Sequence, residues 1–461
     1  IARELNTDTV LVGTFHLAGD RILTSLSLVD AKSGLLSWAE EFEAPFEDIF
    51  HMQREIAVRA ATSLKRSLTG EEEAALITPE SRSVDAYDLY LQGAHLTQEG
   101  TREATDIAFG YFNQALELDR SLAEAHVGLG VVNYNRYYYG WGGGLDSLDR
   151  AEASFRKALE LSPTSMRARR GLINVHYQRG HLEACLMEGR EAVRLGNPHD
   201  VETLLTQATA YQLGGLAEEG AALFREVLEI DPVNQEAQWR LVTSTWLGER
   251  ELIVEAGRSY LRRFGDDPEI HMFVAFAHHL LGHTERARGH YEQAVGLPAR
   301  GDSTAEATAE PAALFFGGLL YEQLGEPDRA TELWQLGVDI YRPRLEESPD
   351  NRRFGLILAG FYGLLGDRGS MRAIEERTLG GADWISWEVH WLALVHALRG
   401  EPDLAIELLH RALKLGLVDS SRVPAWEVYF RVADVPMPEN EAFTRFVGEY
   451  RAEARRLRET Y

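Results

Sequence analysis

The 461-residue chain contains one cysteine, Cys185, so it cannot form an internal disulfide and its fold does not depend on an oxidising compartment. The longest apolar run, Leu356 to Leu365, is far shorter than the roughly 18 residues of a membrane span. Lys and Arg number 47 against 72 Asp and Glu, a formal net charge of −25. Because phosphate backbones need a cationic surface, this balance argues against nucleic-acid and anionic-membrane partners and favours neutral or basic proteins or peptides.

Motifs that carry catalysis or cofactor binding are also missing. The chain has no Gly-rich loop ending in Gly-Lys-Ser/Thr, no His-Glu-x-x-His, no Cys-x-x-Cys and no Gly-x-Ser-x-Gly turn. His279 and His283 have a spacing that can present two imidazoles to a metal on one helical face. However, we expect Gly282 to end that helix first, and His278 occupies a position that tyrosines fill elsewhere in the chain. The sequence therefore predicts no catalytic, cofactor or metal site.

What the chain does contain is a recurring arrangement of small and bulky residues. One copy consists of Gly220, Phe224 and Val227, followed by Pro232. Small residues let two helices approach closely, and the bulky residue fills the gap to the next pair. A hairpin of this kind cannot bury its apolar face alone, so the repeat predicts a stacked helical solenoid. The small position recurs at intervals of about 31 to 43 residues, at Ala108, Ala151, Cys185, Gly220, Ala256, Ala287, Ala330, Met371 and Ala405.

This pattern resembles the tetratricopeptide repeat (TPR), as in the copy formed by Tyr211, Gly215, Gly220, Phe224 and Pro232. The resemblance implies a mainly α superhelix of about nine antiparallel helix pairs over residues 85–420. It also implies that the first helix of each pair lines a concave groove for a protein or peptide. Alternatively, the arginines at these positions lie on a solvent-exposed helix face and form ion pairs with acidic residues four positions away. The groove residues implied are Arg167, Arg170, Asn174, Tyr177, Glu202, Thr209, Gln212, Gln238, Thr245, Glu269, Met272 and His279.

Residues 1–68 follow a different pattern. Strand-like runs at Thr9–His16, Arg21–Asp30 and Leu35–Glu43 are separated by short glycine-containing turns, which predicts a three-stranded antiparallel meander. A helix is expected from Phe46 to Leu68. The whole predicts a small α/β element in front of the solenoid. The apolar face of its helix is formed by Ile49, Met52, Ile56, Ala60 and Leu64.

Several segments carry a second resemblance. They are Ile1–Leu5, Val10–Gly13, Leu28–Ala31, Ser33–Gly34, Leu36–Glu40, Asp48–Phe50 and Asp85–Gly93. Together they resemble the C-terminal half of the TolB amino-terminal-like domain of bacterial signalling proteins and the start of the repeats that follow it. In that family the half-domain and its repeats follow an effector: a class III adenylate cyclase, a Ser/Thr kinase or a winged-helix DNA-binding domain. The resemblance therefore implies a noncatalytic regulatory scaffold, or a regulatory fragment of one of those effectors. It implies a cytoplasmic location, or an extracytoplasmic one if a membrane span precedes Ile1.

Three segments depart from the repeat. Residues 69–84 are acidic and turn-rich and are expected to form a linker. An aromatic, glycine-rich insertion contains Tyr138, Tyr139 and Trp141. It is interpreted either as a ligand pocket or, preferably, as an extended helix that packs its rings on the neighbouring hairpin. Residues 421–461 leave the repeat pattern and are predicted to form a solubilising helical cap.

Overall fold

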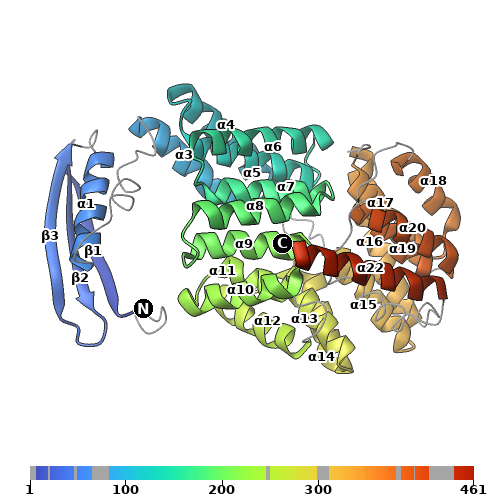
Figure 1. Cartoon of the computed structure of the whole chain (residues 1–461). Coiled ribbons are helices and arrows are strands. Elements are labelled where there is room, and N and C mark those ends of the chain that lie inside the picture. Colours follow the sequence, from blue (N-terminus) through green and yellow to red (C-terminus); the bar gives the residue numbers. More distant parts are fainter. Residues whose placement is uncertain are drawn as a thin grey trace.

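The chain divides into a small sheet with one helix and a long array of helices (Figure 1). The computed structural model describes residues 7–18, 21–45, 49–64, 83–142, 144–244, 250–297, 311–347, 349, 351–379, 386–398, 400–414 and 441–460. The expected linker therefore lies almost wholly outside the described residues, and so does the first half of the expected cap.

The three strands form an antiparallel sheet in the order β1-β2-β3, as predicted. They are β1 (Thr9–Ala18), β2 (Arg21–Asp30) and β3 (Leu36–Pro45), and Leu28 on β2 lies opposite Trp38 on β3. Helix α1 (Ile49–Leu64) packs on one face, where Ile22, Phe42 and Met52 are buried together.

The predicted apolar face of α1 is only partly confirmed. Ile56 packs against the buried cluster of Ile22, Phe42 and Met52, but 62% of Leu64 is exposed at the end of the helix. Because Leu64 is the last residue of the described helix, it extends past the residues that the sheet covers. The apolar spacing correctly predicted the helix, but it did not show where contact with the sheet ends.

The rest of the described chain is a TPR-like solenoid in which helices α3 to α20 pair into nine hairpins. The first five hairpins are α3 (Val84–Thr97) with α4 (Arg102–Leu118), α5 (Ala123–Tyr138) with α6 (Gly144–Leu161), α7 (Met166–Gln178) with α8 (Leu182–Leu195), α9 (Val201–Leu213) with α10 (Ala217–Ile230), and α11 (Gln235–Ser244) with α12 (Arg250–Phe264). The last four are α13 (Pro268–Leu280) with α14 (Thr284–Gly296), α15 (Pro311–Gln323) with α16 (Pro327–Glu347), α17 (Arg352–Leu364) with α18 (Arg368–Leu379), and α19 (Ser386–Leu398) with α20 (Pro402–Lys414).

Local signals explain where these helices begin and end. The Ser165 hydroxyl accepts a hydrogen bond from the Ala168 backbone N–H, and Asp200 does the same for Thr203, so both cap a helix N-terminus. Gly215, in the turn between α9 and α10, has a φ of 93°, a conformation that favours glycine. The hairpin geometry therefore depends on short polar and glycine signals between the apolar faces.

The small repeat position makes the close helix contacts that the sequence predicted. A Cβ on Gly220 would lie 2.8 Å from the Ala208 carbonyl oxygen, so α10 packs directly on the backbone of α9. Cys185 is fully buried and burial raises the pKa of its thiol, which makes it a packing residue. In the fifth hairpin the expected Ala256 is only half-buried, and the adjacent Gly257 makes the close approach to Val274 instead.

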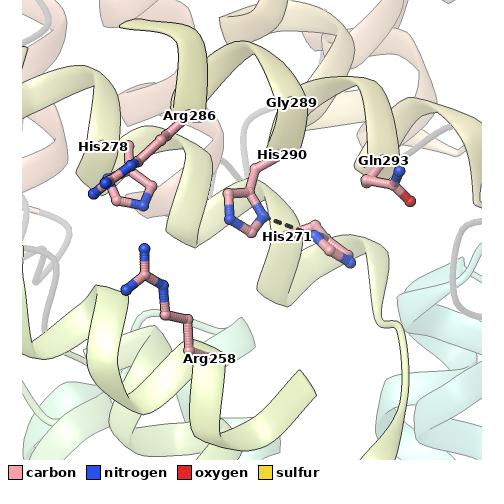
Figure 2. Close-up of a pocket in the computed structure, with 7 residues that line it drawn as sticks. All are labelled: Arg258, His271, His278, Arg286, Gly289, His290 and Gln293. Atoms are coloured by element: carbon pink, nitrogen blue, oxygen red, sulfur yellow. Dashed lines mark hydrogen bonds between the residues drawn. The ribbon is translucent and has the colours of Figure 1, made fainter. Parts of the chain in front are cut away.

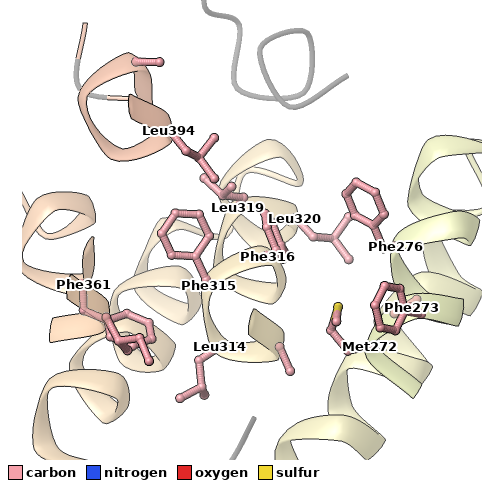
Figure 3. Close-up of a cluster of buried hydrophobic side chains, with 14 of the residues drawn as sticks. Met272, Phe273, Phe276, Leu314, Phe315, Phe316, Leu319, Leu320, Phe361 and Leu394 are labelled. Carbon is pink, nitrogen blue, oxygen red and sulfur yellow. The ribbon is translucent and has the colours of Figure 1, made fainter. Parts of the chain in front are cut away.

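An aromatic core joins the first helices of the later hairpins (Figure 3). The ring centroids of Phe276 on α13 and Phe316 on α15 lie 5.6 Å apart. Those of Phe315 on α15 and Phe361 on α17 lie 6.4 Å apart. Burial of several large rings makes a substantial contribution to stability, so this core helps to hold α13, α15 and α17 together.

The last described helix, α22 (Glu441–Thr460), packs on α20 and also returns to the middle of the array (Figure 1). Leu457 is buried with Leu182 and Leu186 of α8 and with Leu216, which precedes α10. The Thr460 carbonyl accepts a hydrogen bond from Arg190 on α8. This helix therefore does more than cover the end of a solenoid, because it ties the C-terminal hairpins to the third and fourth hairpins.

Candidate binding groove

The first helices of neighbouring hairpins contact one another, as α7 and α9 do. Arg170, one of the predicted groove residues, lies on α7 and reaches the first helices of the next two hairpins. Its guanidinium donates to the Glu202 carboxylate on α9 at 2.8 Å and lies 3.9 Å from the Glu236 carboxylate on α11. Only 12% of the Arg170 side chain is exposed. One arginine thus connects three successive first helices, through contacts between helices that the sequence did not specify.

A second arginine continues this network, which we call the groove ladder and define as Arg170, Glu202, Gln212, Glu236 and Arg240. Arg240 pairs with Glu236 at 3.0 Å and donates to the Gln212 Oε1 atom at 3.1 Å. Burial alone would raise the pKa of Glu236, but Arg240 and Arg170 outweigh it and hold this pKa below its usual value. The ladder is therefore a network of ion pairs and hydrogen bonds that joins α7, α9 and α11.

Several predicted groove residues remain accessible at the N-terminal side of the ladder. Arg167 is exposed and donates to the Tyr90 hydroxyl on α3 at 3.0 Å. Asn174 is half-buried, and its amide donates to the Arg170 carbonyl at 2.9 Å. The Glu202 side chain is 53% exposed. These three side chains offer a partner a cation, an amide and a carboxylate on two adjacent helices.

Other predicted groove residues are turned inward. Thr209 has no exposed surface, and its hydroxyl donates to the Leu205 carbonyl. Met272 is buried in the aromatic core. Gln238 is buried and donates to the Pro232 carbonyl at 2.9 Å. We leave these three out of the surface that we propose, and Thr245 lies outside the described residues.

The remaining predicted residues lie on the groove side but already have structural contacts. Tyr177 packs against the buried cluster that Leu457 of α22 completes. Glu269 is half-buried in the first turn of α13. The His279 Nε2 atom lies 2.8 Å from the Gln323 Oε1 atom on α15, and burial lowers the pKa of this histidine.

The aromatic insertion contacts a distant hairpin as well as its own neighbours. The guanidinium of Arg353, on α17, lies over the Tyr138 ring at 4.3 Å from its centroid and donates to the Tyr138 carbonyl at 3.3 Å. The rings of Tyr139 and Trp141 stack at 4.7 Å. Helix α5 does extend to Tyr138, as the preferred interpretation required, but its rings meet the eighth hairpin rather than only the adjacent one. The insertion thus helps to bring the C-terminal hairpins back over the second hairpin.

Among the residues that the structure describes, no group of three or more His, Cys, Asp or Glu side chains is placed to hold a metal ion. None of the described helices is both long and apolar enough to cross a membrane. A cavity of ≈ 290 Å³ does lie outside the groove, and it is lined in part by Arg258, Arg286 and His290. Sequence reasoning noticed the histidines there but missed the two arginines, because Arg258 comes from the preceding hairpin.

No protein-family model matches the chain. A curated protein of Rhizobium meliloti (strain 1021), named "Putative adenylate cyclase 3", is 27% identical over 161 residues, which are 35% of this chain and 27% of that protein. The chain thus spans about a quarter of that relative's length.

Solved structures of TPR proteins are also similar to the chain. A thermophilic TPR protein of Thermus thermophilus matches with a TM-score of 0.35 and 18% identity, covering 42% of this chain and 98% of its own. A TPR protein of Parabacteroides merdae matches with a TM-score of 0.37 and 13% identity, covering 60% of this chain and 98% of its own.

Proposed function

We propose that the chain is a noncatalytic interaction and regulatory module that binds a protein or peptide segment in its concave groove. The observation that carries this proposal is the set of accessible polar side chains Arg167, Asn174 and Glu202, of which Glu202 is also the most exposed member of the ion-paired groove ladder. The ladder fixes α7, α9 and α11 relative to one another, so a partner would meet a preorganised surface. The net charge of −25 favours a neutral or basic partner.

In this proposal the module works as the sensor or interaction region of a bacterial signalling protein in the cytoplasm. The resemblance of the first residues to half of a TolB amino-terminal-like domain supports this role. The three-stranded meander with one helix is compatible with it. In the alternative proposal, the chain regulates an adenylate cyclase to which it is joined. The similarity over 161 residues to a protein named as a cyclase favours this alternative over a kinase or a winged-helix regulator.

The test of groove binding compares two double variants in a pull-down from a bacterial lysate, followed by titration of the purified partner. Arg167→Glu with Asn174→Ala changes predicted groove residues without replacing a member of the groove ladder. The matched control, Arg120→Glu with Asn113→Ala, makes the same changes on the first hairpin, where the Asn113 amide likewise donates to the carbonyl four residues earlier. We expect the groove variant to bind at least about tenfold more weakly, and the control to bind like the wild type.

Circular dichroism would verify that both variants remain helical. Equal binding by the groove variant and the wild type would overturn the proposed site. The regulatory alternative needs a different measurement: cyclase activity of the longer protein with and without the groove substitutions. A change in activity without any captured partner would favour the cyclase alternative.

A further inference from the structure

An open pocket with cationic side chains, which we call the cationic cavity, lies between the second helices of the fifth and sixth hairpins (Figure 2). Its volume is ≈ 290 Å³. Arg258 enters it from α12, His271 and His278 from α13, and Arg286 and His290 from α14, with Gly289 and Gln293 completing the lining. The side chains thus approach from three helices and from several directions.

Neither guanidinium has a partner in the part of the chain that the structure describes. Arg258 and Arg286 are exposed and make no hydrogen bond or ion pair with any described residue. Two unpaired guanidiniums around one cavity repel each other, and an anion between them would remove that repulsion.

Three histidines line the same cavity, and most of their ring nitrogens already have partners. The Nδ1 atoms of His271 and His290 lie 2.9 Å apart, and the His271 Nε2 atom faces Asp266 at 3.2 Å. The Nδ1 atom of His278 lies 3.2 Å from that of His283. When His283 donates in this pair, the proton of His278 sits on Nε2. That atom is buried and has no partner among the described residues, and only 1% of His278 is exposed.

These groups suit an anion better than a metal ion. The His271 and His290 Nδ1 atoms are already bonded to each other, so they are not free to coordinate, and two guanidiniums would repel a cation. Burial, followed by the charge of Arg258, lowers the pKa of His278 to about 4. Burial, followed by His271, His278 and Arg258, lowers that of His290 to about 4.

We propose that this cavity binds a tetrahedral oxyanion of the phosphate class. The cationic and imidazole side chains come from α12, α13 and α14 in different directions, so an anion with oxygens on several sides can reach more of them than a planar carboxylate can. Guanidinium forks fit phosphate oxygens well. The volume exceeds that of a bare phosphate group, so a phosphate monoester of a small molecule and free phosphate share the required chemistry. Binding at this site does not require a partner at the predicted groove residues.

The test is isothermal titration of the full chain with inorganic phosphate, ribose 5-phosphate, sulfate and acetate at constant ionic strength and neutral pH. We expect saturable one-to-one binding of phosphate and sulfate, and at least about tenfold weaker binding of acetate. Tighter binding of ribose 5-phosphate than of phosphate would assign the site to a monoester, and equal binding would assign it to free phosphate. Acetate binding as tight as that of phosphate would overturn the tetrahedral class.

The matched variants are Arg258→Gln with Arg286→Gln in the cavity and Arg102→Gln with Arg120→Gln on the first hairpin. All four arginines are exposed, so all four changes should preserve the fold. The cavity variant should lose at least about tenfold in phosphate affinity and the control less than about twofold. Histidine-selective NMR adds a local readout, because phosphate should raise the pKa values of His278 and His290. Absence of saturable binding, or equal losses in both variants, would overturn the proposal.

Discussion

The arginines of the groove ladder and those of the cationic cavity differ in whether they have a carboxylate partner. In the ladder, Arg170 meets Glu202 and Arg240 meets Glu236, each within hydrogen-bond distance. In the cavity, Arg258 and Arg286 meet no carboxylate among the described residues. The two clusters lie in neighbouring hairpins of one array, and both combine charge with partial burial.

This difference in pairing suggests different roles: the ladder arginines hold helices together, and the cavity arginines are proposed to bind a ligand. A part-buried ion pair fixes two helices, and removing one member leaves the other desolvated and unpaired. Arg258 and Arg286 have no carboxylate partner among the described residues, so they form no ion pair there that would fix one helix to another. Such residues make physical sense when an outside anion completes the set. The net charge of the chain does not reveal which arginines are paired, because a strongly acidic chain can still contain a local site for an anion.

The largest expected effect comes from breaking the ladder. Glu236→Gln removes the carboxylate shared by Arg170 and Arg240, whose side chains are only 12% and 10% exposed. Because Glu236 itself is 40% exposed, we expect a loss of about 2 kcal/mol rather than the larger loss of a fully buried pair. Amide hydrogen exchange in α7, α9 and α11 would measure it locally. Arg258→Gln is the matched comparison and should change stability by less than about 0.5 kcal/mol.

Equal destabilisation by Glu236→Gln and Arg258→Gln would contradict the separation between the two clusters. Exchange is the suitable measurement because long repeat arrays do not always unfold in a single transition. Protection in α3 and α4 serves as an internal reference, since these helices lie outside both clusters.

A second, somewhat smaller effect is expected from pH. The pKa values of His278 and His290 in the folded chain are about 4, below the ordinary value of 6.5. Between these two values the unfolded chain binds more protons, so stability is fully present above about pH 6.5 and falls as pH approaches 4. We expect a loss of about 1–2 kcal/mol over this window, reduced because His290 is part-exposed.

Thermal unfolding at several pH values would measure this loss, and His278→Asn should flatten the profile. Sulfate, which remains a dianion throughout, should restore stability most at the acidic end if the cavity binds anions. A profile that His278→Asn leaves unchanged would show that other groups cause the acid sensitivity. The carboxylates, including Glu236, lose their contribution at lower pH, so the two effects are separable.

The repeat period made most of the helical array predictable. Ala151, Gly220 and Ala405 are buried where the pattern required small residues, because each position depends only on contact within a hairpin or with the next one. Gly257 replaced the expected Ala256 because two adjacent small residues offer two equivalent close approaches, and the sequence alone does not choose between them. The return of Leu457 to Leu182 was not predictable, since no local pattern encodes a contact across most of the chain.

The sites were predictable to a lesser degree for the same reason. Arg170 was assigned to the groove from its repeat position, but its carboxylate partners come from two other hairpins. The histidines of the sixth hairpin were visible as a cluster in the sequence. Their meaning changed from packing or metal binding to an anion cavity only when the fold brought Arg258 beside them. Residue spacing in the sequence therefore does not predict sites whose side chains come from several different hairpins.

The smallest effect concerns the exposed ion pairs that hold α22. Arg458 pairs with Glu218 at 2.9 Å and with Glu219 at 2.8 Å, and its side chain is 38% exposed. Arg458→Ala should cost about 0.5–1 kcal/mol at low salt and almost nothing at high salt, because exposed pairs are screened. Hydrogen exchange in the first turns of α8 and α10 would report the loosening of α22.

The ladder provides the contrast, since its part-buried pairs should keep most of their contribution at high salt. Leu457→Ala is the control for apolar docking and should loosen α22 at every salt concentration, because burial of Leu457 does not depend on screening. A loss from Arg458→Ala that persists undiminished at high salt would mean that these exposed pairs behave like the ladder. In that case the exposed ion pairs of α22 and the part-buried pairs of the ladder would respond to salt in the same way. The arginine clusters of this protein would then differ only in whether a carboxylate partner is present.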